Sequence, residues 1–109
     1  MQVITAPKAI TPKKWELSGL QGISDATLET HFRLYEGYVK NTNLLYERLG
    51  DMRSAGKVSG TDPGYAELVR RLGFEYNGVR LHELYFDNLT KRPAELRSGK
   101  LHDILGDTF

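Results

Sequence analysis

The amino-acid sequence predicts an all-α protein: two long antiparallel helices forming a helical hairpin, with an extended N-terminal arm and a short C-terminal helix. Apolar residues recur at helical spacing over residues 25–49 and again over residues 63–89, which places them along one face of each helix. A polar, glycine-containing loop over residues 51–61 separates the two stretches. Helices joined by one loop pack side by side in opposite directions.

The composition fits one small domain with a hydrophobic core. The chain has 109 residues, of which 39% are hydrophobic, and its 15 Lys and Arg nearly balance its 14 Asp and Glu. It has neither a basic field for nucleic acid nor an apolar stretch of membrane length, so we expect no nucleic acid and no membrane as partners. Because it also lacks cysteine and a signal peptide, we expect a reducing compartment, the cytoplasm.

Residues 1–22 are predicted to form the N-terminal arm. The prolines and mixed polarity of this stretch disfavour a helix. We expect Trp15, Leu17 and Leu20 to anchor the arm on the core, with Trp15 as a packing residue.

The first long helix has a clear start. Ser24 is a suitable N-cap, and Asp25 in the first turn suits the helix dipole. We expect the helix to run to about residue 49, with Gly50 just beyond its end. Gly37 costs about 1 kcal/mol inside a helix relative to alanine, which suggests a close approach by another group at that level. The apolar stripe consists of Leu28, His31, Phe32, Tyr35, Tyr38, Val39, Leu45, Tyr46 and Leu49.

The second long helix begins at an Asp62 N-cap followed by Pro63 in the first turn. It is expected to run to about residue 89, as one helix or as two segments bent at Gly73. Its apolar face is predicted to contain Tyr65, Leu68, Val69, Leu72, Phe74, Gly78, Leu81, His82, Tyr85, Phe86 and Leu89.

Residues 90–97 are polar and contain Pro93, so they are predicted to be a linker. A short helix is expected from Lys100 to about Leu105, with its apolar side chains, Leu101, Ile104 and Leu105, facing inward. The hairpin alone leaves apolar surface on its open side, which another element must cover.

Two of the three histidines, His31 and His82, fall on the predicted inward faces of different helices. Neutral imidazole is a common metal ligand. Metal sites take four or more ligands, so two histidines form only half of one. The alternative is a pair of core histidines bonded to tyrosine or backbone. His102 is expected on a solvated face, and no phosphate loop, Ser/His/Asp set or close carboxylate pair is present.

Four segments resemble the iron/manganese superoxide dismutase family. Residues 82–89, HELYFDNL, are similar to the family's His-x-[Leu/Phe]-aromatic-aromatic-x-Asn-Leu segment. Residues 24–32 resemble the start of its first long helix, and residues 37–43 its Tyr-Val-x-Asn-x-Asn segment. Residues 99–109 resemble, more loosely, the stretch that leads into its second domain. The matches occur in the family's order.

The resemblance implies a metal site and an activity. In this family the N-terminal hairpin carries one metal-binding histidine on each helix, and His31 and His82 match those positions. Tyr38 matches the tyrosine near the metal-bound solvent, which implies a catalytic role for it in orienting that solvent. The implied cofactor is iron or manganese, one ion per complete site, and the implied substrate is superoxide. Gly78 stands where iron-type members often carry a glutamine, and it is expected to leave that space open, as in manganese-type members.

The chain also departs from the family pattern. His31 and Tyr38 are one residue closer together than is usual, which suits a straight helix without a bulge. A histidine that the family carries near the middle of this segment, outside the set of metal ligands, is replaced here by Leu34 or Tyr35. The Asp-x-Trp-Glu-His motif of the family's second domain is absent.

These points predict three units: the arm, a dismutase-like hairpin over residues 23–92, and a linker with a short helix over residues 93–109. The last unit would lead to an absent C-terminal α/β domain. The chain is thus interpreted as the N-terminal half of a homo-oligomeric superoxide dismutase, inactive alone, whose other ligands come from that domain or a partner chain. The rival hypotheses are a metal-free helical interaction module and a homodimer that offers four histidines.

Overall fold

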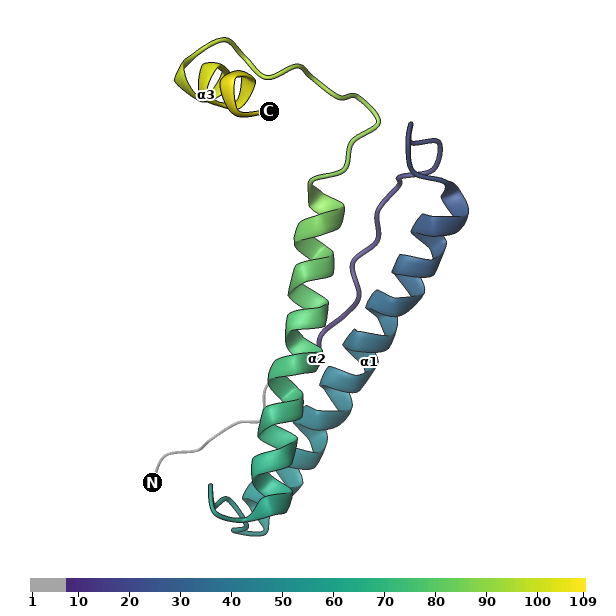
Figure 1. Ribbon diagram of the computed structural model, residues 1–109. Coiled ribbons are helices and arrows are strands. Elements are labelled where there is room, and N and C mark those ends of the chain that lie inside the picture. The colour runs from purple at the N-terminus through teal and green to yellow at the C-terminus, as the bar shows by residue number, and fades with distance from the viewer. Residues whose placement is uncertain (1–7) are drawn as a thin grey trace.

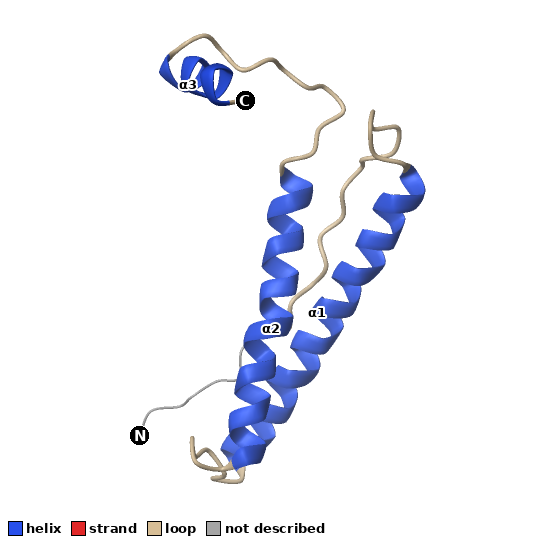
Figure 2. Ribbon diagram, viewed as in Figure 1, coloured by secondary structure: helices blue, strands red, loops and turns tan. Residues whose placement is uncertain are grey.

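In the computed structural model, which describes residues 8–109, two long helices lie side by side and antiparallel (Figure 1). Helix α1 spans Asp25–Ser54, α2 spans Pro63–Asp87, and the short α3 spans Lys100–Thr108. The described residues contain no strand (Figure 2), which confirms the predicted all-α fold class. The first seven residues of the predicted arm lie outside the described range.

Both long helices begin where the sequence predicts. The Ser24 hydroxyl accepts a hydrogen bond from the Thr27 N–H at 3.1 Å, and an Asp62 carboxylate oxygen accepts one from the Tyr65 N–H at 2.9 Å. These bonds satisfy N–H groups that have no partner within the first turn of a helix.

The predicted end of α1 at Gly50 is wrong, because the helix continues to Ser54. The chain leaves the helix at Gly56, which takes the left-handed conformation at φ +72°. There the Lys57 N–H donates to the Met52 carbonyl at 2.8 Å, a bond that closes helices ending at a left-handed glycine. A single interior glycine such as Gly50 costs a helix about 1 kcal/mol, too little to stop it.

Helix α2 is one continuous helix through Gly73, but its buried face is rotated from the predicted one. Its buried residues are Glu75, Val79, Glu83 and Phe86. Four large side chains predicted to face inward are instead exposed: Val69, Phe74, Leu81 and Tyr85. The inward stripe includes two glutamates, which a pattern of apolar residues alone does not reveal.

Helix α3 stands apart from the hairpin (Figure 1) and contacts neither long helix. The prediction that its apolar side chains face inward is therefore wrong: Leu101, Ile104 and Leu105 are 60%, 51% and 38% exposed. The linker carries α3 beyond the end of α2, where the described chain offers it nothing to pack on. No helix in residues 8–109 is long and apolar enough to cross a membrane.

The core lies between the arm and the two long helices. Trp15 packs on Phe86, with ring centroids 4.8 Å apart, and its indole N–H donates to Asp87 at 2.8 Å. This confirms the predicted anchoring of the arm by Trp15, Leu17 and Leu20. The buried apolar members of the core are Leu17, Leu28, Tyr35, Val39, Val79 and Phe86, and Trp15 and Leu20 pack against them.

Polar bonds also hold the arm to α1. The Asn43 side chain accepts a hydrogen bond from the Ile10 N–H at 2.8 Å and donates one to the Ile10 carbonyl at 2.9 Å. These two hydrogen bonds resemble the pairing of a residue with a neighbouring strand, because they satisfy the backbone N–H and C=O of Ile10 together.

The close approach predicted at Gly37 occurs instead at Gly78. A Cβ atom added at Gly37 would meet nothing within 4 Å, whereas one added at Gly78 would overlap the ring of Tyr38. Gly78 therefore allows the Tyr38 ring of α1 to lie directly against the backbone of α2.

This difference predicts opposite effects of two glycine substitutions. Gly37→Ala should raise the free energy of unfolding of the chain by about 1 kcal/mol, because alanine favours the helix and meets no neighbour. Gly78→Ala should lower it, because the added methyl displaces the Tyr38 ring. Urea denaturation followed by circular dichroism measures both. Equal stabilisation by the two alanines would contradict the packing of Tyr38 on Gly78.

Candidate metal centre

His31 of α1 and His82 of α2 face each other across the hairpin. Their ring centroids are 5.9 Å apart, with the ring planes inclined by 45°, and both side chains are partly buried. An ion about 2.1 Å from an imidazole nitrogen lies about 3.3 Å from the ring centre, so two rings on one ion are at most about 6.6 Å apart. The observed separation is compatible with a shared ion.

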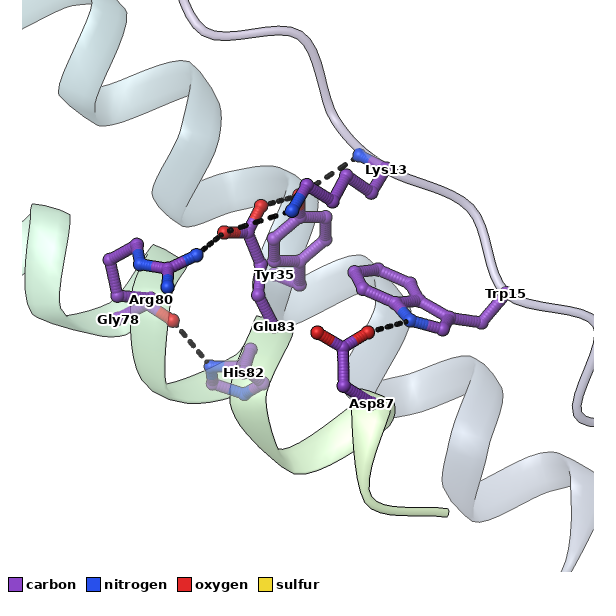
Figure 3. Close-up of polar contacts among 8 residues, drawn as sticks. All are labelled: Lys13, Trp15, Tyr35, Gly78, Arg80, His82, Glu83 and Asp87. Atoms are coloured by element: carbon purple, nitrogen blue, oxygen red, sulfur yellow. Dashed lines mark hydrogen bonds and ion pairs between the residues drawn. The ribbon is translucent and has the colours of Figure 1, made fainter. Parts of the chain in front are cut away.

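A backbone carbonyl fixes the tautomer of His82. Its Nδ1 lies 2.7 Å from the Gly78 carbonyl oxygen (Figure 3). A carbonyl oxygen can only accept, so Nδ1 carries the proton of this bond. In the neutral ring, Nε2 then has a free lone pair, the form in which histidine binds a metal.

His31, unlike His82, has a buried ring nitrogen without a hydrogen-bond partner in the described chain. This nitrogen is Nδ1. Buried polar atoms without a partner are uncommon in native proteins. The described chain thus provides two imidazoles whose hydrogen bonding leaves ring nitrogens available, and these fit a bound ion.

A hollow of about 180 Å³ adjoins the two histidines. Its walls are His31, His82, Leu81 and Tyr85. Because Leu81 is 64% exposed and Tyr85 43% exposed, the hollow opens on the surface of the hairpin. The described residues contain no group of three or more His, Cys, Asp or Glu that could hold a metal, so the hollow brings two donors and no third.

The ring of Tyr38 also lies beside His82, with ring centroids 5.4 Å apart. The ring of Tyr38 fills the space over Gly78, so the expectation that this space stays open is wrong. Helix α1 is regular between His31 and Tyr38, as their spacing predicts. The structure therefore brings the two predicted ligands and the predicted catalytic tyrosine together around His82.

His102 takes no part in this cluster. It lies on α3, half exposed, with Nδ1 3.4 Å from a carboxylate oxygen of Asp103. This position agrees with the solvated face predicted for it.

A buried carboxylate beside His82 was not predicted. Glu83 is 4% exposed, and it accepts hydrogen bonds from the Tyr35 hydroxyl at 2.8 Å and from Arg80 at 2.6 Å (Figure 3). The Tyr35 hydroxyl in turn accepts a bond from the Lys13 N–H at 2.9 Å. The sequence signal was present: Glu83 lies four residues after Val79 and three before Phe86, on the inward face of α2.

The environment of Tyr35 predicts a pH dependence of stability. The pKa of Tyr35 is raised from 10.0 to about 12. Burial is the largest cause, and the hydrogen bond to Glu83 is the next among the causes that raise it. Between these values the unfolded chain loses the proton and the folded chain keeps it, so stability present below pH 10 is lost as the pH rises toward 12. Tyr35→Phe should flatten this decline.

The measurement is the urea midpoint at several pH values from neutral to alkaline. Tyr65→Phe, near the start of α2, is the control and should keep the wild-type decline. An equal alkaline slope for Tyr35→Phe and the wild-type chain would contradict the assigned environment.

Comparison with known proteins identifies the family of this chain. No family model and no solved structure matches it. Over 94 residues it is 38% identical to two curated proteins, the iron superoxide dismutases of Aquifex pyrophilus and of Aquifex aeolicus. Each match covers 80% of this chain and 44% of the relative, so the chain spans less than half the length of these relatives. The chain belongs to the iron/manganese superoxide dismutase family.

Proposed function

We propose that this chain supplies two metal ligands, His31 and His82, to a superoxide dismutase, which converts superoxide to oxygen and hydrogen peroxide. The observation that carries the proposal is the facing pair of imidazoles, 5.9 Å apart, on the two helices of the hairpin. The names of the two relatives support the reaction.

Iron is the metal we propose, because both relatives are named iron superoxide dismutases; manganese is the alternative. When bound, such an ion supplies the one-electron chemistry by which one superoxide is oxidised to oxygen and a second, with two protons, is reduced to hydrogen peroxide. Imidazole is a suitable ligand for iron.

The residues of the chain have separate tasks in this proposal. His82 is oriented by its bond to the Gly78 carbonyl at 2.7 Å, which directs Nε2 rather than Nδ1 to the ion. Tyr38, held between Gly78 and His82, places its hydroxyl to orient solvent and pass protons. Tyr85 and Phe86, whose rings lie 6.0 Å from His31 and 5.9 Å from His82, wall the site.

The remaining ligands are proposed to come from outside these 109 residues, from a C-terminal α/β domain or a partner chain. The described residues bring two donors to the site, and a redox ion needs more. Residues 93–109 would lead from the hairpin over residues 23–92 toward that domain. The large exposed side chains of α2 and α3 would be covered there or in a homo-oligomer.

Replacement of either histidine should remove the metal. In the assembled enzyme, His31→Ala and His82→Ala should each lose most of the bound ion, because each removes one donor. His102→Ala, on the exposed face of α3, is the matched control and should keep a full complement. Elemental analysis of the purified proteins gives the metal content per site. Full metal in either variant would show that the altered histidine is not a ligand.

Replacement of Tyr38 should separate turnover from metal binding. Tyr38→Phe keeps the ring over Gly78 and removes only the hydroxyl, so metal content should stay unchanged. Turnover should fall about tenfold, since water replaces the lost proton donor only in part. Stopped-flow decay of superoxide measures the rate. A wild-type rate would mean that the hydroxyl has no role in proton delivery.

The second candidate is a metal-free helical interaction module related to the dismutase hairpin. The exposed side chains that line the hollow, Leu81 and Tyr85 at 64% and 43%, favour a binding surface of some kind. Under this alternative, the two alanine variants would bind no less metal than the wild type and would only leave a small cavity. The histidine experiment therefore also decides between the two candidates.

A further inference from the structure

The buried carboxylate of Glu83 has no task in the proposed chemistry, yet it is the residue next to His82. Consecutive residues of an α-helix point about 100° apart. His82 therefore lines the hollow, while Glu83 points toward α1 and the arm (Figure 3).

The bond between Tyr35 and Glu83 joins the two turns of helix that carry the histidines. Tyr35 lies one turn after His31 on α1, and Glu83 directly follows His82 on α2. Their oxygens are 2.8 Å apart, and both side chains are buried. A change in the register of the two helices would break this bond and separate the imidazoles together.

The surroundings leave this bond one direction only. A tyrosine hydroxyl has one proton to donate. Because the Lys13 N–H donates to the hydroxyl oxygen at 2.9 Å, the hydroxyl proton goes to Glu83. The other carboxylate oxygen accepts from Arg80 at 2.6 Å and lies 4.0 Å from the Lys13 ammonium. Two cations thus face one carboxylate, which makes the bond a charge-assisted one.

Another contact between the helices at this level, the Tyr38 ring on the backbone of Gly78, limits how closely they approach. Hydrophobic contact by itself has no direction. The buried hydrogen bond between Tyr35 and Glu83 adds a directional constraint to that packing.

We propose that Glu83 is a positioning residue of the two-histidine site, because its bond to Tyr35 sets the register at which His31 and His82 face each other. The claim that this register matters for metal binding rests on the proposed function. The claim that the Tyr35–Glu83 bond sets the register concerns only residues of this chain.

The test uses the full 109-residue chain and three glutamate variants. Glu83→Met keeps the length of the side chain and removes the acceptor, while Glu83→Gln keeps an oxygen for Tyr35. Glu75→Met is the matched control: Glu75 is 2% exposed, lies on α2, and is paired with Arg71 at 2.7 Å. The Glu75→Met variant thus removes an equally buried, arginine-bound carboxylate two turns away from His82.

Two readouts follow the imidazoles themselves. The first is the nuclear Overhauser effect between the rings of His31 and His82 in the metal-free chain. The second is titration with Zn²⁺, a diamagnetic probe that imidazole binds readily, followed by the ring resonances. Neither depends on dismutase activity.

Glu83→Met should lose the Overhauser effect between the rings and bind Zn²⁺ about tenfold more weakly, at the low end for a residue that supports a metal ligand. Glu83→Gln should restore most of both signals, and Glu75→Met should keep both. If Glu83→Met behaved like Glu75→Met, the proposal would be overturned.

A second variant covers the case in which Glu83→Met does not fold. Tyr35→Phe removes only the hydroxyl and should weaken both signals in the same direction, so wild-type signals in that variant would also overturn the proposal. Failure of the proposed function would look different. If the histidine ring resonances of the wild-type chain did not change on addition of Zn²⁺, the ligand assignment would be wrong. The comparison of Overhauser effects would still decide the role of Glu83.

Discussion

The contact between the Tyr38 ring and the backbone at Gly78 is the constraint on which the rest of the site depends. Any side chain at position 78 would occupy the place of that ring. The same glycine offers its carbonyl to Nδ1 of His82 at 2.7 Å. One residue without a side chain thus sets the local separation of the helices, the place of the tyrosine and the orientation of one proposed ligand.

Local patterns in the sequence were enough for the elements of the fold. The caps at Ser24 and Asp62 are local hydrogen bonds, so residue type and spacing predict them well. The end of α1 was misplaced because Gly50 and Gly56 look alike in sequence. Only Gly56 takes a positive φ, and whether a glycine does so depends on the bonds that the following residues find.

The site was only partly predictable, for a related reason. His31 and His82 could be paired because each lies on an amphipathic helix and each matches a family segment. Glu83 was missed because its burial depends on residues far away in the sequence. These are Tyr35, 48 residues earlier in the chain, and Lys13 of the arm, which contacts both Tyr35 and Glu83. Gly37 was misjudged for the same reason: an interior glycine signals a close approach only where the opposite helix brings a ring to it.

The carbonyl that orients His82 belongs to the main chain of its own helix. A carbonyl oxygen has two lone pairs, so it can serve both the helix and the imidazole. No side-chain replacement can delete this acceptor, and it moves with the histidine whenever the helix moves. The orientation of the His82 ring therefore does not depend on the type of any neighbouring side chain, so long as α2 stays a helix. The Nδ1 of His31 has no such acceptor in the described chain. The orientation of the His31 ring therefore depends on the packing of neighbouring side chains.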